Sequence, residues 1–190
     1  SYKRIAEKYP NNLIFFSLCH SYPVANDWLK KIMIHFNDNS FIGTSGSNES
    51  LYSTFIKKKK FRIIFNLFNY FYLKKNFKPF PNPHIRTINF LLYGKKYLEF
   101  VKLRNFNNKK DAWNTESGVN GLTNFFIKKK YDVLIVNSDG KAFSARKFKN
   151  SETYCYLNQS KQLFSDKHSR KYDQLSNANK LKVSNDVWLK

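Results

Sequence analysis

The segment LIFFSLCHSYPVANDWL, residues 13–29, decides the fold class predicted for this chain. Residues 13–18 form an apolar run broken only by Ser17, which is typical of a buried parallel strand. A polar turn follows, and then Asn26 and Asp27 supply the cap and the first turn of an amphipathic helix. A strand that runs into a helix in this way indicates an α/β layer fold.

The rest of the chain continues this alternation. Apolar runs predict further strands at residues 41–42, 85–93 and 132–137. Helical periodicity predicts helices at residues 2–8, 95–101 and 116–130. After residue 151 the pattern weakens into polar loop with short helical pieces. The 190 residues fit one domain, which carries a basic aromatic insertion at residues 55–80.

The charge balance is strongly basic, with a formal net charge of +21. Six of the 34 basic residues are arginine, the residue that reads guanines and phosphates in a bidentate way, so the composition disfavours a nucleic-acid partner. Two explanations stay open. One is an AT-rich coding bias, which also enriches Asn, Phe, Ile and Tyr. The other is attraction to a membrane surface or an anionic substrate.

Targeting and redox features point to the cytoplasm. The sequence holds no apolar run of the roughly 18 residues needed to span a bilayer and no signal peptide. Cys19 and Cys155 match no zinc spacing and are expected to be free thiols. The chain begins at Ser1 without a methionine, on what we interpret as the end of a helix, so we expect a processed product or a fragment.

Two polar clusters lie at the ends of predicted strands, and ligands bind near strand ends in open α/β sheets. The first contains His20 and Ser21, and a neutral imidazole there can ligate a metal or hydrogen-bond a phosphate. The alternative is a solvent-facing loop histidine. The second contains His84 and Arg86, which are two residues apart on a strand and can hold a diphosphate together. The alternative is an arginine that pairs with an acid to lock the proline-rich loop.

A third cluster surrounds Glu116, which falls in the first turn of the helix predicted at residues 116–130. The helix macrodipole favours an ionised carboxylate at that position. Such a carboxylate in a cleft can act as a general base on a hydroxyl nucleophile. The alternative is that Glu116 only caps its helix together with Thr115. The chain contains neither a G-x-S-x-G motif nor a P-loop.

These clusters belong to an ordered set of motifs: FFSLCHS, NDWL, GTSGSNES, PFPNPHIRTINF, ESGVNGLT, DVLIVNSDGK and QSKQLFSD. The set, from about residue 13 to residue 172, resembles the carboxyl-terminal two thirds of a group of bacterial family 2-like glycosyltransferases with a GT-A type fold. The resemblance implies a Rossmann-like mixed sheet flanked by helices. It also implies transfer of a sugar from a nucleotide-sugar donor to a glycan or lipid-linked acceptor. The amino-terminal nucleotide-binding β-α-β units of that group have no counterpart in this sequence.

The resemblance also implies roles for particular residues. Glu116 takes the position of the catalytic base of an inverting transfer, and Leu18 and His20 take the two positions of the metal-binding D-x-D motif. Neither is a carboxylate, so binding of Mg²⁺ or Mn²⁺ is in doubt and His20 is the one candidate metal ligand. We expect His20 and Ser21 near the donor diphosphate, with His84 and Arg86 stabilising its charge. Candidates for acceptor or loop-organising contacts are Asp111 and Asp166.

The insertion carries a distinct prediction. Residues 57–75 place apolar side chains at helical spacing between lysine clusters, namely Phe61, Ile64, Phe65, Phe68 and Tyr72. Such a segment can lie peripherally in the inner face of the membrane, where lipid-linked acceptors are found. The alternative is an insertion helix packed on the core. A rival to the transferase as a whole is a non-catalytic basic module that binds anionic glycan, membrane or nucleic acid.

Overall fold

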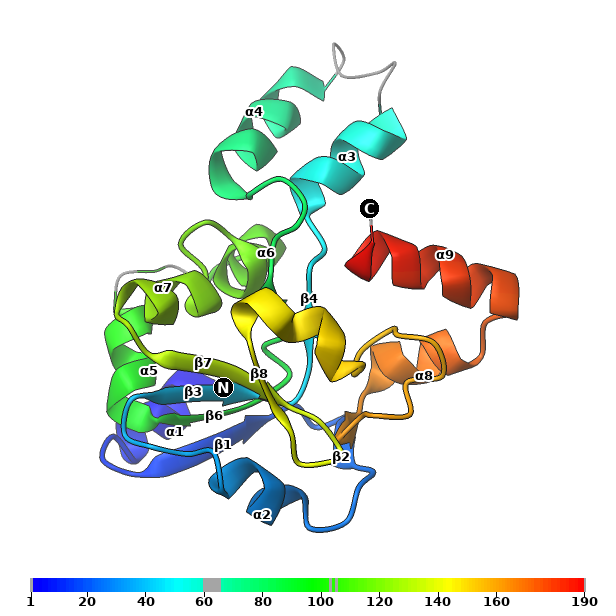
Figure 1. Ribbon diagram of the computed structural model, residues 1–190. Helices are drawn as coiled ribbons and strands as arrows, with labels where there is room; N and C mark the ends of the chain where they lie inside the picture. Colours follow the sequence, from blue (N-terminus) through cyan, green and yellow to red (C-terminus); the bar gives the residue numbers. More distant parts are fainter. Residues whose placement is uncertain (1, 60–65, 103, 105, 190) are drawn as a thin grey trace.

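A mixed five-stranded sheet forms the centre of the fold (Figure 1). The computed structural model describes residues 2–59, 66–102, 104 and 106–189. The strands, in sheet order, are β1 (Leu13–Ser17), β6 (Asn89–Tyr93), β3 (Ser40–Gly43), β7 (Asp132–Val136) and β8 (Ala142–Ser144). Only β3 and β7 pair in parallel, and the other three pairs are antiparallel. The prediction of an α/β fold with a mixed sheet flanked by helices is therefore confirmed.

Two short ladders and a set of helices complete the fold. The ladders pair β2 (Tyr22–Pro23) with β9 (Phe164–Ser165), and β4 (Gly46–Ser47) with β5 (His84–Ile85). The first helices are α1 (Tyr2–Lys8), α2 (Trp28–Met33), α3 (Leu51–Lys59), α4 (Leu67–Asn76) and α5 (Gly94–Val101). The later ones are α6 (Lys109–Ser117), α7 (Leu122–Lys128), the 3₁₀ helix η2 (Ala145–Ser151), α8 (Lys167–Asp173) and α9 (Asn177–Trp188).

Both faces of the sheet are packed, because its central strands alternate apolar side chains between them. Phe41, Phe90 and Leu92 join the larger core cluster with side chains of α1, α5 and α7. Ile42 and Leu91 point to the opposite face, where a smaller cluster includes side chains of α2. The predicted strands at 41–42 and 132–137 and the predicted helix at 95–101 are confirmed by β3, β7 and α5.

The opening segment differs from its prediction in one respect. Strand β1 exists, but it lies at the sheet edge and runs antiparallel to β6, whereas a buried parallel strand was expected. Three of its five residues are only half-buried. An apolar run indicates burial but does not indicate the direction of a strand. The apolar character of β1 is explained by the aromatic contacts of Phe15 and Phe16.

Two predicted elements are divided in the structure. The strand expected at 85–93 is split into β5 and β6, which belong to different sheets. The helix expected at 116–130 is interrupted by a turn between Gly118 and Gly121, so that its first two residues end α6, which begins at Lys109, and the rest forms α7. A Cβ at Gly118 would lie 2.5 Å from the carbonyl oxygen of Asn114, so the chain turns where only glycine fits. Glu116 therefore lies in the last turn of α6, and its predicted place in a first turn is wrong.

Helices are found near the end of the chain and in the described parts of the insertion. Helix α9 was not predicted, because its exposed surface is polar on most sides and only Ser184, Val187 and Trp188 are buried. In the insertion, α3 and α4 form a hairpin that projects away from the sheet (Figure 1). The predicted positions Phe61, Ile64 and Phe65 lie outside the described residues. In the described part of the chain, no helix is both long and apolar enough to cross a membrane.

Candidate functional site

Two adjoining cavities, which together we call the cleft, lie where β5, the end of α6 and the start of α8 meet. Their volumes are about 290 Å³ and 370 Å³. Arg86, Glu116 and His168 line both cavities. His84 lines the smaller cavity, and the larger one is lined by three further predicted residues, His20, Ser21 and Asp166. The structure thus brings together all the predicted site residues except Asp111.

Glu116 is held by a residue from another element. Its Oε2 accepts hydrogen bonds from the backbone N–H of Thr87 at 3.0 Å and from the Thr87 hydroxyl at 2.7 Å. Thr115, proposed as its capping partner, instead donates to the carbonyl oxygen of Asp111. Among the described residues Oε1 accepts no hydrogen bond. Because the last turn of a helix disfavours a carboxylate, these two bonds and not the macrodipole fix Glu116.

Arg86 pairs with an acid, as the alternative interpretation of this residue proposed. Its Nη1 lies 2.7 Å from Oδ2 of Asp166, its Nη2 donates to Oδ1 at 3.4 Å, and both side chains are buried. The guanidinium also stacks on Tyr154, with Cζ 3.5 Å from the ring centroid. This pair connects the loop after β5 to the start of α8. Both residues line the cleft, so the pair fixes the position of two parts of its wall.

Asp166 is therefore a loop-organising residue as well as a cleft residue. Its Oδ1 accepts from the backbone N–H groups of His168 and Ser169, which caps α8. Burial alone would raise the pKa of its carboxyl. The charge and hydrogen bonds of Arg86, together with the two backbone donors, outweigh burial and hold that pKa below its ordinary value.

The remaining predicted residues differ in their freedom to bind a ligand. His84 is buried, and its Nδ1 donates to the carbonyl oxygen of Asn82 at 2.8 Å, which leaves Nε2 as the ring nitrogen that can contact a ligand. The Ser21 hydroxyl donates to the carbonyl of Ser165 and accepts from Asn89, so it is engaged within the protein. His20 is exposed at the rim of the larger cavity.

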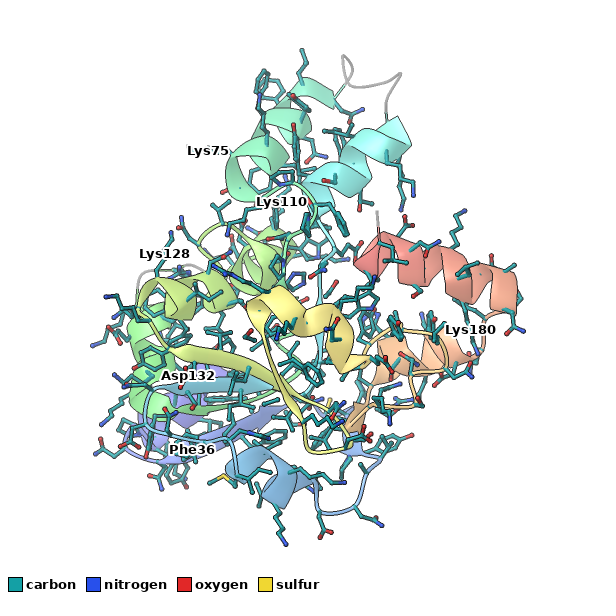
Figure 2. All side chains as sticks on the ribbon, viewed as in Figure 1. Phe36, Lys75, Lys110, Lys128, Asp132 and Lys180 are labelled. Carbon is teal, nitrogen blue, oxygen red and sulfur yellow. The ribbon has the colours of Figure 1, made fainter. Side chains whose placement is uncertain are left out.

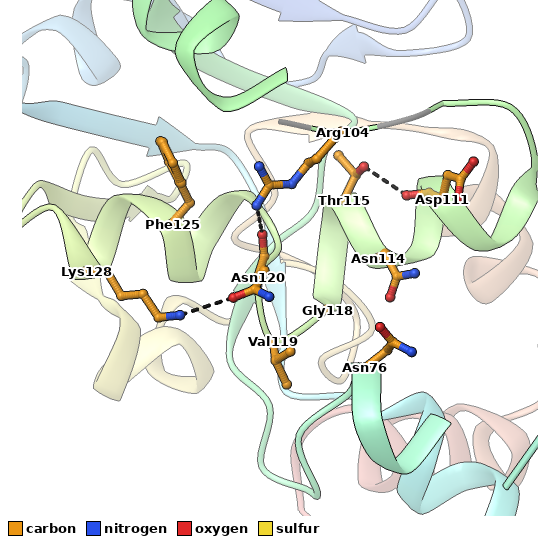
Figure 3. A pocket seen from close by; sticks show the side chains of 10 residues that line it. All are labelled: Asn76, Arg104, Asp111, Asn114, Thr115, Gly118, Val119, Asn120, Phe125 and Lys128. Carbon is orange, nitrogen blue, oxygen red and sulfur yellow. Dashed lines mark hydrogen bonds between the residues drawn. The ribbon is translucent and has the colours of Figure 1, made fainter. Parts of the chain in front are cut away.

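Asp111 lies away from the cleft, on the other side of α6. Its Oδ2 accepts from the backbone N–H groups of Asn107 and Asn108, which completes the capping box at the start of α6. It lines a third cavity of about 550 Å³ (Figure 3). On the wall opposite α6, Arg104 and Lys128 both donate to Asn120. The structure therefore does not bring Asp111 together with the other predicted residues.

Several cleft residues were missed in the sequence. His168 follows Asp166 by two positions, and the D-x-x-S spacing of a helix cap was the available signal for placing it at a helix start. Tyr154 lies under Arg86, and burial raises the pKa of its hydroxyl. Glu49 and Trp113 line the smaller cavity, and Lys167 lines the larger one. All three lie in or beside motifs of the sequence, and none was assigned a role: Glu49 is in GTSGSNES, Trp113 precedes Glu116 by three residues, and Lys167 directly follows QSKQLFSD.

The donor set of the cleft does not fit a metal. Within the residues that the structure describes, no three side chains of His, Cys, Asp or Glu are grouped closely enough to hold an ion. The carboxylate of Asp166 is already bound by Arg86. Cations and imidazoles outnumber free carboxylates in the cleft, which suits an anionic ligand. We therefore derive no metal-dependent step.

Both cysteines are free thiols, as predicted: Cys19 is exposed and Cys155 is buried. Comparisons with protein-family models, with curated proteins and with solved structures find no match to this chain. The proposals below therefore depend on the motifs of the sequence and on the geometry of the cleft.

Proposed function

We propose that this chain is a transferase domain of the GT-A type, which moves a sugar from a nucleotide-sugar donor to a hydroxyl group of a glycan or a lipid-linked acceptor. The observation that carries the proposal is the placement of Glu116. Its carboxylate is fixed through Oε2 by Thr87 at the junction of two cavities. A base that faces two adjoining cavities can contact an acceptor in one and a donor in the other.

The two cavities offer different chemistry. Trp113 lines the smaller one, and an aromatic face of this kind stacks on sugar rings, so we assign it to the acceptor. His20 and Lys167 line the larger one, and an imidazole and an ammonium group suit a diphosphate, so we assign it to the donor. His168 lines both and can contact either substrate.

The reaction that follows is an in-line displacement. Glu116 accepts the proton of the acceptor hydroxyl, and the resulting oxygen forms a bond to the anomeric carbon. The bond from that carbon to the nucleoside diphosphate breaks, and its electron pair leaves on the phosphate oxygen. His20 and Lys167 stabilise the charge that develops there. One base and one displacement invert the anomeric configuration.

Release of nucleoside diphosphate from a panel of nucleotide sugars, with glycan and lipid-linked acceptors, tests the proposal. Glu116→Gln keeps the shape and the acceptor oxygen but removes the base, so turnover should fall by about 10² to 10⁴. Glu99→Gln is the matched control, because Glu99 is a half-exposed carboxylate on α5 that pairs with Lys129. Wild-type turnover by Glu116→Gln would show that another group is the base.

A second candidate is a non-catalytic module that binds anionic glycans. The observation that favours it is the excess of cations and imidazoles in the cleft over free carboxylates. Such a module would show salt-sensitive glycan binding, no preference for nucleotide sugars, and unchanged binding in Glu116→Gln. Absence of turnover with every donor, together with this binding behaviour, would favour it over the transferase.

A further inference from the structure

The α3–α4 hairpin has an exposed face for which the fold gives no reason. It is anchored at its base, where the Ser50 hydroxyl donates to the carbonyl of Lys78 at 2.5 Å and the Ser53 hydroxyl accepts from the N–H of Phe80 at 2.8 Å. From there the two helices project away from the sheet, with α9 beside α3 (Figure 1). Within described α4, only Leu73 is fully buried.

The first turns of α4 expose large apolar side chains toward the far end of the hairpin. Leu67 is 44% exposed, Phe68 is 96% exposed and Phe71 is 60% exposed. Positions i, i+1 and i+4 of a helix lie on one side, so the three side chains form a continuous apolar face. Phe68 is the most exposed of the large apolar side chains in the described residues. Exposure of this much apolar surface to water is unfavourable, and covering the face with another surface would remove that cost.

The hairpin itself carries charges of one sign, and one of its lysines, Lys57, pairs with Asp186 of α9. Residues 51–80 contain seven lysines and one arginine, and neither aspartate nor glutamate. In the described part of the hairpin, Lys57 and Lys58 on α3 and Lys74 and Lys75 on α4 are exposed, and Figure 2 shows Lys75 on α4. Lys75 follows Phe71 by four residues, which places it on the same side of the helix. An apolar face bordered by cations is complementary to a surface that has an anionic outer layer and an apolar layer directly below it.

We propose that this hairpin docks on a membrane surface rich in anionic lipid, with Phe68 and Phe71 at the boundary between head groups and acyl chains. Aromatic side chains on a basic amphipathic helix partition to that boundary, and lysines near anionic head groups add to the affinity. A second copy of this chain would bring lysines against lysines. Nucleic acid is disfavoured, because the described cations of the hairpin are lysines and not arginines. The inference does not depend on the proposed transferase activity.

Cosedimentation with vesicles tests the apolar part of the proposal. The intact chain should bind vesicles of phosphatidylcholine mixed with phosphatidylglycerol, and bind vesicles of phosphatidylcholine alone much more weakly. Phe68→Ser with Phe71→Ser should weaken binding by about tenfold or more, because two aromatic side chains no longer leave water. Ile34→Ser is the matched control, since Ile34 is 64% exposed at the C-cap of α2, and should bind as the wild type does.

The electrostatic part is tested with charge reversals. Lys58→Glu with Lys74→Glu should weaken binding to the mixed vesicles by more than about tenfold, because each lysine near anionic lipid contributes roughly fivefold. Lys30→Glu with Lys182→Glu changes the net charge equally at exposed sites on α2 and α9, and should have a small effect. All substituted positions are exposed, so circular dichroism should show unchanged folding.

Several results would overturn the proposal. The first is absence of binding by the wild type to the mixed vesicles. The second is equal binding by the double serine variant. Preference for RNA over mixed vesicles would identify a nucleic-acid surface instead. A dimer in sedimentation velocity that disappears in the double serine variant would identify a contact between copies of the chain.

Discussion

Helix α6 carries two acidic residues, and the environments of their carboxylates are opposite. Asp111 lies in the first turn, where it completes a capping box and the macrodipole favours its charge. Glu116 lies in the last turn, where the macrodipole disfavours a carboxylate, and Thr87 from another element holds it in place. The helix itself explains Asp111. It does not explain Glu116, and a carboxylate that another element holds at a cleft, against the macrodipole, is a candidate for function.

Asp166 combines both situations, because it caps α8 as Asp111 caps α6 and lines the cleft as Glu116 does. The largest expected effect on stability follows from removing it. Asp166→Ala should lower the free energy of unfolding by about 3–5 kcal/mol, because Arg86 is then buried without its partner. Urea unfolding measures this loss. Arg86→Leu combined with Asp166→Leu should be less destabilised than Asp166→Ala, since no unpaired charge stays buried.

The same pair predicts a pH dependence. The pKa of Asp166 is held below its ordinary value of 3.8, so the ionised carboxylate contributes its full stability above that value. That contribution is lost as the pH falls through the lowered pKa of the folded state. Unfolding measured between neutral pH and about pH 3 should therefore show a smaller acid-induced loss in the double leucine variant than in the wild type. Equal slopes would mean that the pair does not control acid stability.

A smaller effect, on turnover, is expected from a substitution of Thr87, which positions Glu116. Thr87→Val removes the hydroxyl donor at 2.7 Å and should lower turnover by about tenfold, with Thr87→Ser restoring it. Because Thr87 positions the base and does not contact the substrates in this proposal, the loss should fall on kcat and leave KM within a few-fold of the wild type. Wild-type kcat in Thr87→Val would show that the hydroxyl does not position Glu116.

The comparison also shows what the sequence could predict. Polar residues beside apolar runs predicted residues that line the cleft, since His20 follows β1, His84 lies in β5 and Arg86 follows β5. The pairing of Arg86 with Asp166 could not be predicted, because it joins residues 80 positions apart in the chain through packing of α8. The start of the helix predicted at 116–130 was misplaced, and α6 before it was not predicted, because the steric limit at Gly118 that separates α6 from α7 depends on the folded backbone. Helix α9 was missed because burial of Trp188, which donates to the carbonyl of Tyr154, does not show in a polar sequence.

The smallest predicted effects separate the two carboxylates of α6 directly. Asp111→Ala removes a capping acceptor and should cost about 1 kcal/mol of unfolding free energy while leaving turnover within a few-fold of the wild type. Glu116→Gln keeps an acceptor for Thr87 and removes a charge from the last turn, so stability should be unchanged or raised by about 0.3–1 kcal/mol. Thermal unfolding and turnover, measured on the same two proteins, should therefore change in opposite patterns. A stability loss in Glu116→Gln equal to that of Asp111→Ala would mean that Glu116 is also a structural residue, and its position against the macrodipole would then require no catalytic explanation.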